Sequence, residues 1–160
     1  GKDDHILAGV TYDPVREEMF TAEEGKGAFL NGAPIKASET TELSRSLLCC
    51  DLGYVDEKAG YALDLIRSLW PDMYSVRFMG SSGLGLAYAA AGRVDLYFHH
   101  SLMPWDLATG LVLAQEAGAK VVDRQGNQGA LFTPSVIVSN PLLVEEFLRT
   151  TDGQPWRTAG

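Results

Sequence analysis

The first part of the chain alternates short apolar runs with turn residues. Residues 6–12 are apolar and rich in β-branched side chains, and Asp13-Pro14 ends the run because proline restricts the backbone of the residue before it. Residues 18–22 read as a second short strand, and the Asn31-Gly32 pair marks a tight turn further on. Residues 6–36 are therefore predicted to form an antiparallel meander.

From residue 47 onwards the hydrophobic period switches repeatedly between that of a strand and that of a helix. The run 47–51 is continuously apolar up to its last residue, which is typical of a strand buried on both faces. Asp56 is a candidate N-cap for the first helix, and Gly92 and Gly118 end the second and third. The pattern predicts helices over residues 56–69, 81–91, 106–117 and 141–149, with strands over 74–78, 93–98, 119–122 and 135–139.

Strands that alternate with helices favour a layered α/β fold with a mainly parallel sheet, because a helix returns the chain between parallel strands. The opening meander adds antiparallel strands to this architecture. We expect residues 1–37 to be antiparallel strands left from an N-terminal sheet and residues 38–150 to form a C-terminal α/β subdomain. Residues 151–160, rich in Gly, Pro and Thr, are expected to be a flexible tail.

Charge and composition exclude several classes of partner. The 160 residues carry 13 Lys and Arg against 21 Asp and Glu, a formal net charge of -8, which repels nucleic acid and anionic lipid. No apolar run approaches the roughly 18 residues that a membrane span needs. The two cysteines, Cys49 and Cys50, are adjacent and apolar in context, which indicates buried thiols in a reducing, cytoplasmic compartment.

A glycine and serine segment stands between a predicted strand and a predicted helix. The backbone N–H groups and hydroxyls of Gly80, Ser81 and Ser82 would face outward at the helix N-terminus, a place that favours an anion such as phosphate. The segment is neither a dinucleotide fingerprint nor a Walker sequence, because its glycine spacing differs and no lysine follows. A serine N-cap without a ligand is the alternative interpretation.

Two further positions are candidates for chemistry. Asp106 follows Pro104-Trp105 at a predicted helix start, where a carboxylate either caps the first turn or binds a hard cation. His99 and His100 end a predicted strand, and since neighbouring strand residues face opposite ways they are not expected to share one ion. A hydrogen-bonded loop histidine is the alternative. No serine or cysteine triad pattern stands out, so a hydrolase built from this chain would use a metal.

Taken together, these segments resemble the inositol monophosphatase family of magnesium-dependent phosphatases. The resemblance is strongest at the tryptophan and aspartate motif of residues 104–110 and covers most of the chain. It rests on residues 9–16, 25–32, 77–82, 87–95, 104–110 and 116–119.

The resemblance implies roles for individual residues. It makes Asp106 a magnesium ligand and catalytic residue, with capping as a second role, and it places Gly80, Ser81 and Ser82 in the substrate site. His99 stands where family members often carry a glutamate that contacts a substrate hydroxyl. Imidazole is not an obligate acceptor at neutral pH, so this departure leaves the substrate less defined than the reaction.

The resemblance also implies what lies outside this chain. The family's other metal ligands belong to an upstream glutamate pair and an Asp-Pro-Ile-Asp-Gly-Thr motif, which have no counterpart here. We therefore expect the C-terminal part of a phosphatase, inactive alone, whose partner is the missing N-terminal portion and which is a homodimer when intact. The implied substrate is a small phosphorylated polyol, above all inositol monophosphate. The alternative substrates are a bisphosphate nucleotide, fructose bisphosphate and histidinol phosphate. The alternative to a phosphatase is a noncatalytic dimerisation or regulatory module.

Overall fold

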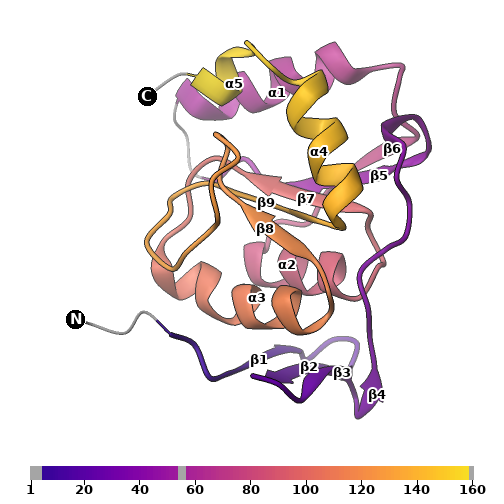
Figure 1. The fold of residues 1–160 in the computed structure, drawn as a ribbon, viewed down its shortest axis with the longest axis vertical. Helices are drawn as coiled ribbons and strands as arrows, with labels where there is room; N and C mark the ends of the chain where they lie inside the picture. The colour runs from indigo at the N-terminus through magenta and orange to yellow at the C-terminus, as the bar shows by residue number, and fades with distance from the viewer. Residues whose placement is uncertain (1–4, 54–56, 159–160) are drawn as a thin grey trace.

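The computed structural model describes residues 5–53 and 57–158 and arranges them in four layers. A small antiparallel sheet lies at one end, followed by a pair of helices, a mixed sheet and a second group of helices (Figure 1). The predicted α/β class and its layered arrangement of sheets and helices are confirmed.

The antiparallel sheet is the meander predicted from the sequence. Its strands are β1 (Ala8–Asp13), β2 (Glu18–Glu23), β3 (Gly27–Leu30) and β4 (Ala33–Pro34), paired in that order. Phe20, Ala22 and Ala28 point inward and are buried, whereas Val10 and Tyr12 of β1 and Met19 of β2 stay exposed on the outer face. The alternation of inward and outward side chains therefore leaves this sheet with one covered face and one bare face.

The mixed sheet has the strand order β6-β5-β7-β9-β8, and it is mainly parallel as expected, except that β9 runs in the opposite direction. Its strands are β5 (Leu47–Cys50), β6 (Ser75–Phe78), β7 (Leu96–His99), β8 (Lys120–Val122) and β9 (Val136–Ser139). β5 runs parallel to β6 and β7, but β9 runs antiparallel to β7 and β8. The reason is that no helix separates β8 from β9, so the chain folds straight back.

Two helices lie between the two sheets, and three cover the opposite face of the mixed sheet. The inner pair is α2 (Ser82–Ala90) and α3 (Pro104–Glu116), whose small and apolar side chains contact both sheets. The outer group is α1 (Glu57–Leu69), α4 (Pro141–Thr150) and α5 (Pro155–Thr158). The inner helices approach closely because Gly110 faces Leu86: a Cβ at Gly110 would lie 2.4 Å from Leu86 Cδ1. The mixed sheet is thus covered on both faces.

Residues 151–158 differ from the flexible tail expected for residues 151–160, of which 159 and 160 lie outside the described residues. Residues 155–158 form α5, and Trp156 is buried against the rings of Phe98 and Phe147, with centroids 5.2 and 6.3 Å away. Composition pointed to fraying, but one tryptophan buries enough apolar surface to fix the segment. The predicted Asp56 cap lies outside the described residues.

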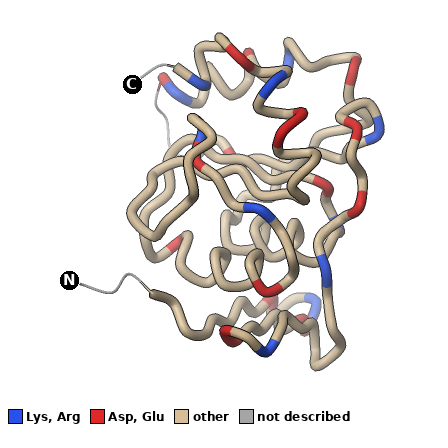
Figure 2. The backbone as a smooth tube through the Cα atoms, viewed as in Figure 1, with Lys and Arg blue, Asp and Glu red and all other residues tan. Residues whose placement is uncertain are grey.

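Several other expectations can be compared with the structure. A short 3₁₀ helix, η1 (Leu43–Arg45), precedes β5, and both cysteines are buried free thiols as predicted. Among the described residues no helix is long and apolar enough to cross a bilayer. Lys and Arg are spread over the described part of the molecule and do not form one basic cluster (Figure 2). The division of the sequence at residues 37 and 38 stays a prediction.

Candidate functional site

The candidate site lies at the edge of the mixed sheet where the neighbouring parallel strands β6, β5 and β7 end. β5, β6 and β7 run in one direction, so the residues that follow them emerge side by side. These residues are Asp51 after β5, the segment 79–82 after β6, and His99 with His100 at the end of β7. The chain then enters α3, which carries Asp106 in its first turn.

The predicted glycine and serine segment forms the turn into α2. Gly80 has a φ of +69°, a left-handed conformation that glycine adopts without strain. Ser81 is the N-cap of α2, and its hydroxyl accepts a hydrogen bond from the Leu84 N–H at 3.4 Å. The N–H groups of Ser82 and Gly83 have no acceptor within the helix, because the first turn lacks preceding carbonyls. The serine N-cap is therefore confirmed, but Gly80 N does not face outward as expected, because it donates to Asp51.

Asp51 holds this turn from the neighbouring strand, a contact that our reading of the sequence missed. Its Oδ1 accepts hydrogen bonds from Met79 N at 2.8 Å and Gly80 N at 2.7 Å. Its Oδ2 accepts one from the phenol of Tyr97 at 3.3 Å. The available signal was the position of a carboxylate directly after a fully apolar strand, at the sheet edge where α/β proteins bind ligands.

Tyr97 is the buried donor beneath the same turn. Its desolvation, followed by the nearby Asp51 carboxylate, raises the pKa of Tyr97 well above its ordinary value. The phenol is therefore protonated and donates to Asp51, and the Ser82 side chain lies near it. Gly85 makes room for the ring, since a Cβ there would lie 2.3 Å from Tyr97 Cε2.

Asp106 is the N3 residue of α3 and performs the capping role predicted for it. Its Oδ2 accepts a hydrogen bond from Met103 N at 3.2 Å, and Pro104 occupies the first position of the helix. Its Oδ1 accepts no hydrogen bond from any residue that the structure describes. Asp106 is half-buried beside Trp105, whose side chain is largely exposed. One oxygen thus fixes the helix start while the other remains open to a ligand.

The donor set formed by the described residues is too small to hold a magnesium ion by itself. A carboxylate oxygen is the ligand type that magnesium prefers, so Asp106 fits the ion chemically. Within residues 5–53 and 57–158, however, no three Asp, Glu, His or Cys side chains gather as a metal site. Asp51 does not add to the set, because its oxygens already accept three hydrogen bonds. Asp106 is therefore a candidate ligand that would need partners from outside the described residues.

His99 is buried, with only 2% of its surface exposed. Its Nδ1 accepts a hydrogen bond from Ser101 N at 3.0 Å, which places the proton of a neutral ring on Nε2. The expectation that His99 and His100 face opposite ways is wrong: their rings stack at 5.0 Å because β7 ends at His99. Gly53 lies against His99, since a Cβ there would come within 3.4 Å of Cε1. The contact of His99 with substrate stays a prediction.

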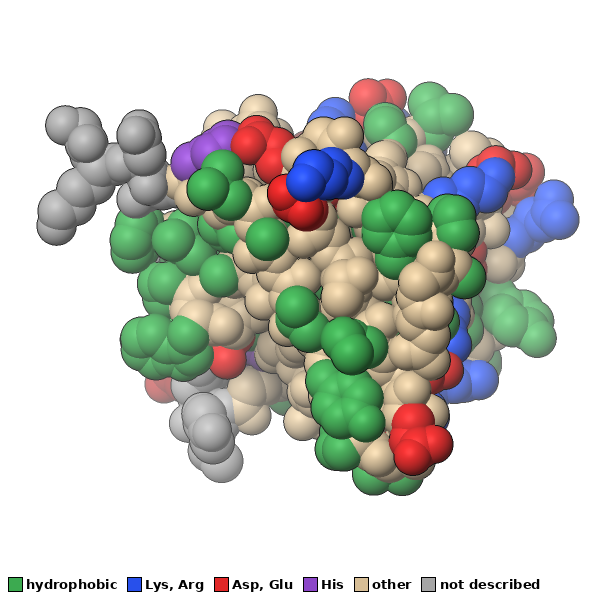
Figure 3. Space-filling view, turned by 90° about the horizontal axis from the view of Figure 1, so that it is seen from below, with side chains coloured by type: hydrophobic (Ala, Val, Ile, Leu, Met, Phe, Trp, Pro, Cys, Tyr) green, Lys and Arg blue, Asp and Glu red, His purple; other side chains and the backbone are tan. Residues whose placement is uncertain are grey.

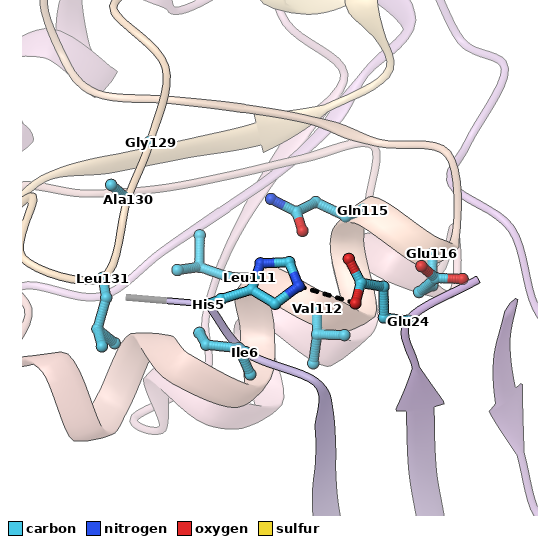
Figure 4. A pocket seen from close by; sticks show the side chains of 10 residues that line it. All are labelled: His5, Ile6, Glu24, Leu111, Val112, Gln115, Glu116, Gly129, Ala130 and Leu131. Atoms are coloured by element: carbon cyan, nitrogen blue, oxygen red, sulfur yellow. Dashed lines mark hydrogen bonds and ion pairs between the residues drawn. The ribbon is translucent and has the colours of Figure 1, made fainter. Parts of the chain in front are cut away.

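Two surface pockets lie along the C-terminal half of α3, away from these residues. One of about 150 Å³ is bordered by the ion pair of His5 and Glu24, 2.8 Å apart, and by Leu111 and Val112 (Figure 4). The other, of about 350 Å³, lies beside β8. Neither is lined by Asp51, Gly80, Ser81, Ser82, His99 or Asp106.

Comparison with known proteins agrees with the fold and the motifs. A family model described as the inositol monophosphatase family matches residues 2–154. The Nus factor SuhB of Salmonella typhimurium is 39% identical over 142 residues, or 87% of this chain and 52% of that protein. The inositol-1-monophosphatase of Mesorhizobium japonicum is 35% identical over 145 residues, or 90% of this chain and 54% of that protein.

A solved structure shows the same architecture. The crystal structure of the extragenic suppressor protein SuhB from Bartonella henselae superposes with a TM-score of 0.85 at 31% identity. The match covers 92% of this chain and 57% of that one. The chain therefore spans about half the length of the curated relatives it matches.

Proposed function

Because the chain belongs to the inositol monophosphatase family, we propose that it is the C-terminal part of a magnesium-dependent phosphatase. The substrate class is a small phosphorylated polyol, with inositol monophosphate preferred. A bisphosphate nucleotide, fructose bisphosphate and histidinol phosphate are the alternative substrates within the same reaction class.

One observation carries the proposal: the two oxygens of Asp106 are in different situations. Oδ2 accepts the hydrogen bond of Met103 N, which orients the carboxylate at the start of α3. Oδ1 accepts none from the described residues, and it lies in the first turn of a helix that follows the candidate edge of the sheet. A residue that served only as a cap would need a single oxygen, so the second supports a role as a metal ligand.

The chain's own residues would contribute orientation and anion binding. When bound, magnesium activates water and polarises the phosphate oxygens. Asp106 would hold the ion together with ligands from the N-terminal portion. The outward N–H groups of Ser82 and Gly83 would orient phosphate or the adjoining polyol, aided by the dipole of α2. Gly80 and Ser81 would shape that turn, and His99 would line the polyol side.

The outer face of the antiparallel sheet is the surface that we assign to the N-terminal portion. Val10, Tyr12 and Met19 are 58%, 54% and 44% exposed there, and apolar side chains gather on this side of the molecule (Figure 3). β1 is an edge strand, with β2 as its one partner among the described strands. An apolar face beside an open edge favours the addition of further chain, and the relatives carry about as much again.

The activity is tested by restoring the absent half. The N-terminal half of the Mesorhizobium relative is joined in front of His5, and phosphate release is measured from inositol 1-phosphate and the alternative substrates. We expect magnesium-dependent release that Asp106→Asn lowers by about a hundredfold or more. Asp64→Asn, on the exposed side of α1, is the matched control. A folded fusion that releases no phosphate from any of these substrates contradicts the proposal.

The docking surface is tested with the two halves as separate chains. Tyr12→Lys is expected to weaken their association, whereas Leu142→Lys, 60% exposed on α4, is expected to leave it unchanged. Equal association of both variants would contradict the assignment.

We also propose that the completed protein is a homodimer and that it is cytoplasmic. Burial raises the pKa of Cys49 to about 12 and that of Cys50 further, so both remain thiols, which suits a reducing compartment. The mass of the completed protein in solution, measured by light scattering, tests the dimer.

A noncatalytic role is the second candidate. The Salmonella relative is named a Nus factor and is as similar to this chain as the relatives named as phosphatases. A transcription-related role would use protein contacts, since the net charge of -8 disfavours nucleic acid. The phosphate-release assay distinguishes the phosphatase from the noncatalytic protein. A noncatalytic role does not require Asp106→Asn to lower phosphate release.

A further inference from the structure

We propose that Asp51 is a positioning residue that holds the substrate turn, Gly80 to Ser82, in place. This inference rests on the proposed function, because it concerns the turn that would contact substrate. Asp51 itself lies beneath the turn, with 8% of its surface exposed.

The carboxylate fills a backbone nest that would otherwise attract a ligand anion. Met79 N and Gly80 N are consecutive and both donate to Asp51 Oδ1, at 2.8 and 2.7 Å. They converge because Gly80 is left-handed, with a φ of +69°. Consecutive N–H groups in such a turn form an anion-binding concavity. Since Asp51 occupies it, substrate phosphate is directed to the next N–H groups along, those of Ser82 and Gly83.

The second oxygen of Asp51 extends its hold to Ser82. Oδ2 accepts a hydrogen bond from the buried Tyr97 phenol, and the Ser82 side chain lies near the same phenol. Asp51 therefore holds Gly80 directly and is connected to the Ser82 end of the turn by the Tyr97 ring. No ion pair joins Asp51 to a Lys or Arg among the described residues, so its partners are these hydrogen-bond donors.

A second carboxylate at the opposite end of β5 provides a matched control. Asp95 Oδ2 accepts a hydrogen bond from Leu47 N at 2.6 Å, and Oδ1 accepts one from the Ser38 hydroxyl. It thus fixes the beginning of the same strand without touching the turn at Gly80. Loss of either carboxylate removes a comparable anchor, but only Asp51 is connected to the substrate turn.

The first measurement is amide hydrogen exchange on the full chain. Asp51→Ala is expected to speed exchange at Met79 and Gly80 by about tenfold or more, whereas Asp51→Asn keeps an acceptor oxygen and remains near wild type. Asp95→Ala should speed exchange at Leu47 only. Unchanged protection of Met79 and Gly80 in Asp51→Ala overturns the proposal, whether or not the completed protein is a phosphatase.

The second measurement is the kinetics of the fusion carrying the N-terminal half. We expect Asp51→Ala to raise KM for inositol 1-phosphate by about tenfold with a smaller change in kcat, and Asp51→Asn to restore KM. Asp95→Ala should leave KM unchanged. A normal KM in Asp51→Ala, or an Asn variant as impaired as the Ala variant, overturns the proposal. An inactive wild-type fusion instead counts against the proposed function, and the exchange experiment then decides the role of Asp51.

If Asp51→Ala does not fold, Tyr97→Phe replaces it in both experiments. This change removes the donor to Oδ2 and keeps the ring. We expect Met79 and Gly80 to stay protected while the amide signals of Ser82 and Gly83 shift. Amide signals of Ser82 and Gly83 that do not move would contradict a connection through Tyr97.

Discussion

The two sheets of this molecule are covered to different extents. The mixed sheet lies between α2 and α3 on one face and α1, α4 and α5 on the other, and its central strands β7 and β9 are wholly buried. The antiparallel sheet packs one face on α2 and α3 and leaves Val10 and Tyr12 exposed on the other. Helices of this chain cover both faces of the mixed sheet, whereas among the described residues they cover one face of the antiparallel sheet.

This difference concerns the docking surface proposed above. The bare apolar face and the open edge strand of the antiparallel sheet are that surface. The carboxyl edge of the mixed sheet, by contrast, is already built, with Asp51 and the turn at Gly80 held by hydrogen bonds. The turn at Gly80 is therefore held within this chain, whereas the outer face of the antiparallel sheet is not covered by any residue that the structure describes.

The largest expected effect comes from a substitution in the hydrophobic core that covers the mixed sheet. Trp156 is buried against Phe98 and Phe147, so Trp156→Ala should lower the free energy of unfolding by about 3–5 kcal/mol, measured by urea denaturation. Val15→Ala, at an 87% exposed position between β1 and β2, should change it by less than about 0.5 kcal/mol. Similar losses for both variants would show that the two sheets are equally complete.

The next effect concerns the helix pair that both sheets share. Gly110→Ala places a Cβ 2.4 Å from Leu86 Cδ1, and the overpacking should cost about 1–3 kcal/mol. Gly60→Ala, within α1 and with no atom inside 4 Å of the new Cβ, should instead stabilise the chain by about 0.5–1 kcal/mol. Urea denaturation checks both, and a neutral Gly110→Ala would mean that the two helices are not tightly packed.

The smallest effect is local and depends on pH. Glu116 accepts hydrogen bonds from Gly25 N and Gly27 N at 2.8 Å each, and these lower the pKa of its carboxyl below the ordinary 4.5. A lowered pKa in the folded protein stabilises it above the ordinary value, and this contribution is lost as the pH falls through the folded-state value.

The protection factors of the Gly25 and Gly27 amides, which correct for the pH dependence of intrinsic exchange, should therefore be high at neutral pH and fall as the pH drops through the folded-state pKa of Glu116, below 4.5. Glu116→Gln keeps one acceptor oxygen, so one of the two amides should lose its protection at every pH. Protection of both amides in Glu116→Gln would show that other contacts attach this sheet to α3.

Much of the fold follows from local patterns in the sequence. The meander was predictable because Asp13-Pro14 and Asn31-Gly32 mark its turns, and α3 because Gly118 ends it. The pairing of β9 was not, because antiparallel and parallel neighbours of a buried strand have the same apolar pattern. The packing of Trp156 was missed because it depends on Phe98, which is distant in the sequence.

The candidate site was predictable in its parts but not in its connections. Motifs identified Gly80 and Asp106, since each has local chemistry at a helix start. Asp51 was missed because its role appears only when β5 and β6 are placed side by side. The burial of His99 likewise depends on Gly53 and His100 around it.

The central claim is that Asp106 is a metal ligand as well as a helix cap. It is tested most directly by titrating magnesium calorimetrically into the fusion with the N-terminal half, in wild type and in Asp106→Asn. Asparagine keeps an oxygen for Met103 N, so the fold should be preserved. We expect the variant to bind magnesium at least about tenfold more weakly, since it lacks the charged ligand. Equal affinity in the two proteins would contradict the account and leave Asp106 as a cap alone.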